Sequence, residues 1–147
     1  MGVHKYFTEE NKLQITNAIR VAENNTSGEI RVHIEKNCKL DVLDRAAYIF
    51  DKLEMQKTQL RNGVLFYLAF EDRKFAILGD AGINEKVPEN FWEEIKEDVI
   101  VSFKEGRFAE GLSNGIIKAG EQLKTHFPHQ DDDVNELSDE ISFGDNK

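Results

Sequence analysis

The sequence predicts an α/β protein, a three-layer α/β/α sandwich with a small mixed central sheet flanked by about four helices. Three observations support this fold class. Segments with the 3.6-residue apolar period of a helix alternate along the chain with short strand-like runs. One such run, residues 64–70 (VLFYLAF), is apolar throughout, which is typical of a strand covered on both faces. A predicted helix separates the first two strands, and a right-handed crossover through a helix makes such strands parallel.

The first half of the chain supplies two helices and a strand. Residues 8–25 form the first predicted helix, because Thr8 can cap it and apolar residues follow at helical spacing. Residues 29–36 alternate between apolar and polar side chains, which predicts a strand with one face less deeply buried. Asp41 can cap a second helix over residues 41–55. The expected inward face of that helix is Val42, Leu43, Ala46, Ala47, Ile49, Phe50 and Leu53.

The second half supplies two strands and two helices. The turn between residues 64–70 and 74–78 is so short that these strands should pair antiparallel. Pro88 is favourable in the first turn of a third helix over residues 88–104. Gly106 ends that helix, and residues 107–125 form a fourth. The predicted element order is therefore αβαββαα.

Composition limits the class of protein. The 147 residues suffice for one ordinary domain, and 39% hydrophobic with 32% charged residues is a globular composition. A net charge of −9 argues against a nucleic-acid partner. No window approaches the ~20 apolar residues of a membrane-spanning helix, and no apolar run precedes the first charges. We therefore expect a cytoplasmic protein that is monomeric or weakly associating.

Negative charge is concentrated at the C-terminal end. Residues 128–147 contain seven carboxylates and one lysine, and they have no apolar periodicity. Self-repulsion and scarce apolar area predict a disordered acidic tail after a domain of residues 1–127. A docking segment that orders on a basic protein partner is the alternative interpretation.

The predicted topology brings three turns to one edge of the sheet, and these turns contain oxygen-bearing side chains. Glu29, Asn62 and Asp80 belong to the turns, and Glu89 follows in the first turn of the next predicted helix. Oxygen ligands of this kind suit Ca²⁺ or Mg²⁺. We therefore expect a weak divalent-cation site at this edge. The same residue types also form turns and cap helices, so a purely structural role stays open.

The opposite edge is the alternative location for a site. Ligands of open α/β sheets usually bind beyond the carboxyl ends of the parallel strands. The polar residues expected there are Asn37, Asp41, Asp44 and Asp72. Asp41 and Asp44 can also cap a helix. His33, alone on the polar face of its strand, is expected to be structural.

Three segments resemble the TPM domain family, over about residues 10–125. They are SGEIRVHI (27–34), RNGVLFYLAFEDRKFAILGDAG (61–82) and FKEGRFAEGLSNGI (103–116). The matching pattern is Asn-Gly before an apolar strand, an Asp-Arg-Lys turn, a glycine-rich turn and a late series of aromatic residues and glycines. Its members here are Asn62, Gly63, Asp72, Arg73, Lys74, Gly79, Gly82, Phe103, Gly106, Phe108 and Gly111.

The resemblance adds an expectation of activity to one of fold. The family includes thylakoid-lumen phosphatase-like proteins and membrane-anchored bacterial proteins. It implies the α/β/α sandwich and, as one function, a metal-dependent acid phosphatase acting on phosphomonoesters, with Asp72 and Asp80 as candidate catalytic residues. The residues themselves favour the other function, a soluble accessory or interaction domain that binds a divalent cation and a protein partner.

Overall fold

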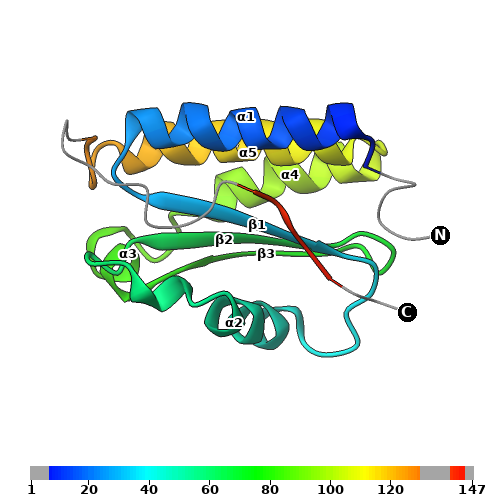
Figure 1. Ribbon diagram of the computed structural model, residues 1–147, viewed down its shortest axis with the longest axis horizontal. Coiled ribbons are helices and arrows are strands. Elements are labelled where there is room, and N and C mark those ends of the chain that lie inside the picture. The colour runs from blue at the N-terminus through cyan, green and yellow to red at the C-terminus, as the bar shows by residue number, and fades with distance from the viewer. Residues whose placement is uncertain (1–6, 130–139, 145–147) are drawn as a thin grey trace.

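The computed structural model describes residues 7–129 and 140–144 of the 147-residue chain (Figure 1). The helices are α1 (Glu9–Asn25), α2 (Val42–Lys52), α3 (Ala81–Lys86), α4 (Glu93–Lys104) and α5 (Phe108–Leu123), with a short 3₁₀ turn, η2 (Met55–Lys57). The strands are β1 (Glu29–Glu35), β2 (Gly63–Ala69), β3 (Lys74–Gly79) and β4 (Ser142–Phe143).

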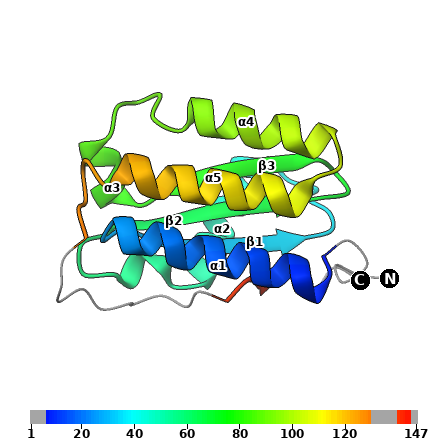
Figure 2. The ribbon, with the colours of Figure 1, turned by 90° about the horizontal axis from the view of Figure 1, so that it is seen from above.

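The four strands form one mixed sheet in the order β3-β2-β1-β4. β1 is parallel to β2 and to β4, whereas β2 and β3 are antiparallel. α1, α5 and α4 lie side by side over one face of the sheet, and α2 lies on the other (Figures 1 and 2). This arrangement confirms the α/β/α fold class and the predicted strand directions. No helix in the described part of the chain is long and apolar enough to cross a membrane.

β2 is the central strand, as its apolar run predicts. All seven of its residues are buried. Val64, Phe66 and Leu68 enter the larger core under α1, α4 and α5, and Leu65, Tyr67 and Ala69 enter the smaller core under α2. Successive side chains of a strand point to opposite faces, so an entirely apolar strand requires a cover on both.

The face of β1 that bears polar residues is more deeply buried than the sequence predicts. Glu29 and His33 are each 4% exposed, and Glu35 is fully buried. The expected inward face of α2 is also partly wrong, because Leu43 is 53% exposed and Ala47 is exposed. α2 packs chiefly against β2 and β3, which leaves the α2 side of β1 to polar contacts.

The region after β3 differs most from the prediction. Asp80 accepts a hydrogen bond from the backbone N–H of Ala81, and the short helix α3 begins there. Pro88 then disfavours a helical conformation at Val87, where α3 ends. The next helix, α4, begins only at Glu93. The prediction of one helix over residues 88–104 with Glu89 in its first turn is therefore wrong, because Glu89 lies between α3 and α4.

The sheet gains a strand from the C-terminal segment, which was not predicted. Ser142 and Phe143 pair with His33 and Ile34, and Ile141 and Phe143 pack against the larger core. Residues 130–139 and 145–147 of the predicted acidic tail lie outside the described residues. The division into a domain of residues 1–127 and a tail of residues 128–147 therefore stays a prediction.

Candidate functional site

The amino end of β1 and the carboxyl end of β3 bring two carboxylates close to one glycine. Glu29 lies beside Gly63 in the parallel register of β1 and β2. On the other side, the N–H of Asp80 donates to the carbonyl of Gly63 at 2.9 Å. Glu29, Gly63 and Asp80 therefore form a row across three neighbouring chain segments. By the alternation of side chains, this row belongs to the sheet face that α2 covers.

Gly63, which is buried, contributes no side chain to this row. Strands lie about 4.8 Å apart, so residues two strands apart have Cα atoms about 10 Å apart. Glu29 and Asp80, which are 4% and 6% exposed, thus lie on either side of a residue without a side chain. We call the row of Glu29, Gly63 and Asp80, on the face that α2 covers, the Gly63 notch.

Asn62 ties the notch to the start of β1. Its Nδ2 donates to the carbonyl of Ser27 at 2.9 Å, and its own carbonyl accepts from the N–H of Glu29 at 3.1 Å. Asn62 is 2% exposed, and its Oδ1 has no hydrogen-bond partner among the described residues. A buried oxygen without a partner is costly, and a cation or an ordered water would satisfy it.

Arg61 holds the second carboxylate of the notch. Its Nε lies 2.7 Å from Asp80 Oδ2 and its second guanidinium nitrogen 2.8 Å from Asp80 Oδ1. This two-point hydrogen bond and the negative charge of Asp80 raise the pKa of Arg61. The Arg61 side chain is 50% exposed, whereas that of Asp80 is 5% exposed.

The backbone at Arg61 is fixed by close packing against α3. Arg61 has a φ of 51°, and its carbonyl accepts from the N–H of Gly82 at 2.9 Å. A Cβ at position 82 would lie 2.2 Å from the carbonyl oxygen of Leu60, so only glycine allows this approach. The main chain of Arg61 is therefore held in place, and only its side chain can change conformation.

The predicted cation ligands are only partly brought together. Glu29, Asn62 and Asp80 meet at one edge, whereas Glu89 lies beyond the far end of α3. Within the described ranges, no three or more His, Cys, Asp or Glu side chains are grouped so that they could hold a metal ion. Two carboxylates and an amide oxygen are hard ligands that suit Ca²⁺ or Mg²⁺ with several waters, and a weak site at this edge stays a prediction.

At the opposite edge, the candidate residues hold the loop that follows β1. Asp72 accepts from the N–H of Cys38 at 2.7 Å and from Asn37 Nδ2 at 3.2 Å. These hydrogen bonds, first that of Cys38, lower the pKa of Asp72. Asp41 accepts from the N–H groups of Leu43 and Asp44 and so caps α2, as predicted.

A buried polar cluster on β1 was not foreseen. Glu35 accepts two hydrogen bonds from Arg45, at 2.8 and 2.9 Å, and one from the hydroxyl of Tyr67. His33 Nε2 lies 3.2 Å from Glu35 Oε1, and His33 Nδ1 lies 2.9 Å from Ser142 Oγ of β4. The cluster therefore joins β1, β2, α2 and the C-terminal strand.

The hydrogen bonds of the cluster set the charge of Glu35. Burial raises the pKa of Glu35, but hydrogen bonds from Arg45, His33 and Tyr67 outweigh burial and hold that pKa well below its usual range. Burial, followed by the hydrogen bond to Glu35, raises the pKa of Tyr67. The cluster thus contains a carboxylate, a guanidinium and a neutral phenol. The carboxylate of Glu35 already accepts hydrogen bonds from Arg45 and Tyr67, so these groups are engaged with one another.

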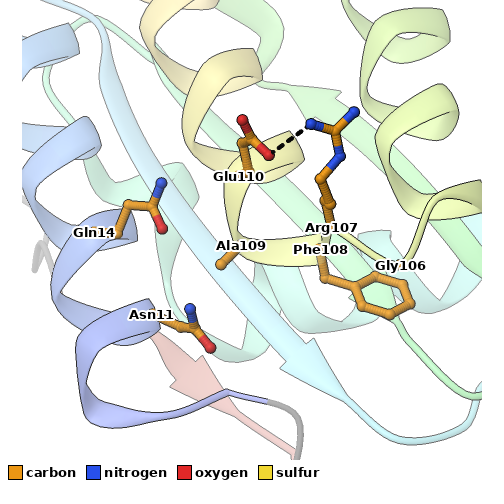
Figure 3. Close-up of a pocket in the computed structure, with 7 residues that line it drawn as sticks. All are labelled: Asn11, Gln14, Gly106, Arg107, Phe108, Ala109 and Glu110. Carbon is orange, nitrogen blue, oxygen red and sulfur yellow. Dashed lines mark hydrogen bonds and ion pairs between the residues drawn. The ribbon is translucent and has the colours of Figure 1, made fainter.

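A hollow of about 220 Å³ lies between the start of α5 and the first turns of α1 (Figure 3). Asn11 and Gln14 of α1 line one side, and residues 106–110 line the other. Arg107 makes ion pairs with Glu105 and with Glu110, so its charge is balanced locally. Gly106 and Phe108, which line the hollow, belong to the series of aromatic residues and glycines that resembles the TPM domain family. None of the carboxylates predicted to form a site at either end of the sheet lines this hollow.

These features define a small α/β/α domain with a carboxylate-flanked notch at one sheet edge. The chain belongs to the TPM domain family, which matches residues 3–122. No curated protein matches the chain at a significant level.

Several solved structures share the fold, including the following three. The NMR structure of the BA42 protein from the psychrophilic bacterium Bizionia argentinensis is 48% identical, with a TM-score of 0.91 over 97% of this chain and 98% of that one. The N-terminal domain of a protein from P. gingivalis is 18% identical, with a TM-score of 0.71 over 87% and 84%. The N-terminal domain of the cg2496 protein from Corynebacterium glutamicum is 12% identical, with a TM-score of 0.61 over 95% and 81%. The last two show the fold alone.

Proposed function

We propose that this protein is an accessory or interaction domain that binds Ca²⁺ or Mg²⁺ weakly in the Gly63 notch. The single observation that carries the proposal is the row of Glu29, Gly63 and Asp80, in which two largely buried carboxylates flank a residue without a side chain. Two carboxylates are costly to bury in one row, and a cation between them would offset part of that cost.

The donor set determines the kind of cation and its affinity. Carboxylate oxygens are preferred ligands of Ca²⁺ and Mg²⁺. Asn62, whose Oδ1 has no hydrogen-bond partner among the described residues, lies at the same edge, although the alternation of side chains assigns it to the other face of the sheet. Few protein ligands leave several positions to water, so the dissociation constant should be on the order of 10⁻⁴–10⁻³ M, as in loosely built calcium modules. Binding would change the charge of the surface formed by the turns of residues 27–29, 61–63 and 79–82, which a protein partner could then recognise.

Calcium titration followed by two-dimensional NMR tests the proposal. We expect saturable shifts at the amides of Glu29, Gly63 and Asp80 in the wild type. Glu29→Gln keeps the size of the side chain and removes its charge, and it should weaken binding at least about tenfold. Gly63→Ala adds a methyl group to the notch and should weaken binding while both carboxylates remain. Glu121→Gln removes one charge from an exposed position on α5 and should leave the affinity unchanged.

Two outcomes would contradict the proposal. Shifts confined to residues near Asp41, Asp44 and Asp72 would place the site at the opposite edge. Shifts confined to the acidic segment of residues 130–147 would mean that the folded domain has no cation site. Phosphomonoester hydrolysis is assayed on the same samples between pH 4 and pH 8, and turnover that disappears in both Asp72→Ala and Asp80→Ala would replace the binding role with a phosphatase.

A further inference from the structure

We propose that Arg61 is a tethered competitor of the cation, and that it moves from Asp80 to Asp51 and Gln56 when the notch is filled. This inference rests on the proposed cation site and describes how that site is regulated. Arg61 and a cation compete for Asp80, because Arg61 occupies one lone pair on each oxygen, the N–H of Ala81 takes a second on Oδ1, and two positive charges at one carboxylate repel each other.

The cation-free arrangement is the one described above. The guanidinium of Arg61 forms two hydrogen bonds with Asp80, and thus provides the positive charge that a buried carboxylate requires. In this proposal, a cation that enters the notch displaces the guanidinium because the two positive charges repel each other. Binding is then an exchange of one positive charge for another, which makes the apparent affinity lower than the ligands alone would give.

In the second arrangement, the guanidinium of Arg61 would donate to acceptors in a neighbouring pocket. A pocket of about 340 Å³ is lined by Arg61, Asp80, Asp51 and Gln56, together with Ala47, Phe50, Leu78 and Gly79. The Oε1 of Gln56 is buried and has no hydrogen-bond partner among the described residues, although its Nε2 donates to Asp51 Oδ1 at 3.1 Å. Asp51 is exposed. A guanidinium released into this pocket can donate to the exposed carboxylate of Asp51, and to the buried oxygen of Gln56 once that side chain turns towards the pocket.

The backbone favours a motion of the side chain alone. The packing of Gly82 against the carbonyl groups of Leu60 and Arg61 fixes the main chain at this point. The half-exposed Arg61 side chain has the reach and the solvent access to change partners, whereas Asp80 is held by its hydrogen bond to Ala81. The two states differ in specific contacts, which is what a ligand needs in order to shift a population.

The first test removes the competitor. Arg61→Gln keeps a long polar side chain on the same backbone and deletes the charge. We expect calcium to bind this variant about tenfold more tightly than the wild type, measured by calorimetry and by NMR titration. Arg73→Gln is the matched control, because Arg73 has a similar φ of 54°, is exposed and lies in the turn at the other edge of the sheet. That control should leave the affinity unchanged.

The second test removes the alternative partner. Asp51→Asn should weaken calcium binding about threefold in the wild type, because the released guanidinium loses an acceptor. In the Arg61→Gln background the same substitution should have no effect, since no guanidinium remains to be released. This non-additivity distinguishes exchange of partners from a general effect of charge. The Nε–H signal of Arg61 should also shift during the wild-type titration.

The outcomes separate this inference from the proposed function. If the wild type binds calcium in the notch and Arg61→Gln does not bind more tightly than Arg73→Gln, the competitor role is wrong and the cation site stands. If Asp51→Asn has the same effect in both backgrounds, the exchange of partners is wrong. If neither the wild type nor Arg61→Gln binds calcium, the cation site and the inference fail together.

Discussion

Glu35 illustrates how one residue can be misread from local pattern. Its place in the alternation of β1 predicts a partly exposed charge, yet it is fully buried. The reason lies far away in the sequence, because Arg45 of α2 and Tyr67 of β2 supply three hydrogen bonds to its carboxylate. Alternation gives the face on which a residue lies, but the partner that permits burial depends on tertiary packing.

Glu35→Gln should lower the free energy of unfolding by about 3 kcal/mol at pH 7, the low end for breaking a buried ion pair, since Arg45 is partly exposed. The folded-state pKa of Glu35 is depressed below its ordinary value of 4.5 by the hydrogen bonds from Arg45, His33 and Tyr67. The stabilisation is therefore present above pH 4.5 and is lost as pH falls towards the folded-state pKa. Urea unfolding at pH 7, 5 and 3 should show the gap between wild type and variant shrinking. A gap that is independent of pH would mean that the charge of Glu35 is not what stabilises the fold.

At the scale of the element, the sequence predicted what local chemistry controls. The caps at Thr8 and Asp41 were correct, because a side-chain oxygen binds N–H groups two or three residues away. The parallel and antiparallel pairings were correct, because the connections leave little choice. α3 was missed, since a six-residue helix has too short an apolar pattern to detect. β4 was missed because its pairing with β1 joins residues about 109 positions apart.

The candidate site, like the elements, was predictable only where it depends on strand topology. Strand topology correctly brought Glu29, Asn62 and Asp80 to one edge. The position of Glu89 was wrong because the position of a helix start was wrong. Neither the pairing of Arg61 with Asp80 nor the orphaned Oδ1 of Asn62 has any signature in the sequence, since both depend on how the turns pack.

Substitution of the central strand tests the two-sided burial of β2. Phe66→Ala should cost roughly 3–5 kcal/mol, because Phe66 is fully buried in the larger core. Val101→Ala on α4 is the control, and at 57% exposed it should change the unfolding free energy by less than about 0.5 kcal/mol. Chemical denaturation measures both. A loss below about 1 kcal/mol for Phe66→Ala would mean that the strand order is wrong.

In the whole molecule, the C-terminal segment lies alongside β1 and covers the side of β1 that faces away from β2. Thr26 forms a bridge with Pro128 at one end of β1, and β4 pairs with the other end. The sheet edge and His33 are thereby covered by residues that the composition assigns to a tail. An acidic composition does not prevent the few apolar residues within it from packing on a domain.

Truncation after His129 tests whether β4 is part of the fold. Because Ile141 and Phe143 are partly buried, the loss should be about 1–2 kcal/mol of unfolding free energy. His33 should also become reactive towards diethyl pyrocarbonate, since the contact with Ser142 is gone. Replacing Asp131, Asp132 and Asp133 with Asn keeps β4 and should change neither property. Unchanged stability and an unreactive His33 in the truncated protein would show that β4 does not cover this edge.

Paramagnetic broadening by Mn²⁺ tests the central claim most directly, because Mn²⁺ accepts the same oxygen ligands as Ca²⁺ and Mg²⁺ and reports its own position. At substoichiometric Mn²⁺, the account predicts that amide signals of Glu29, Gly63 and Asp80 broaden first, and that excess Ca²⁺ restores them. In Glu29→Gln the same signals should stay sharp at that concentration. Broadening centred on Asp72 and Asp41, or confined to residues 130–147, would contradict the account.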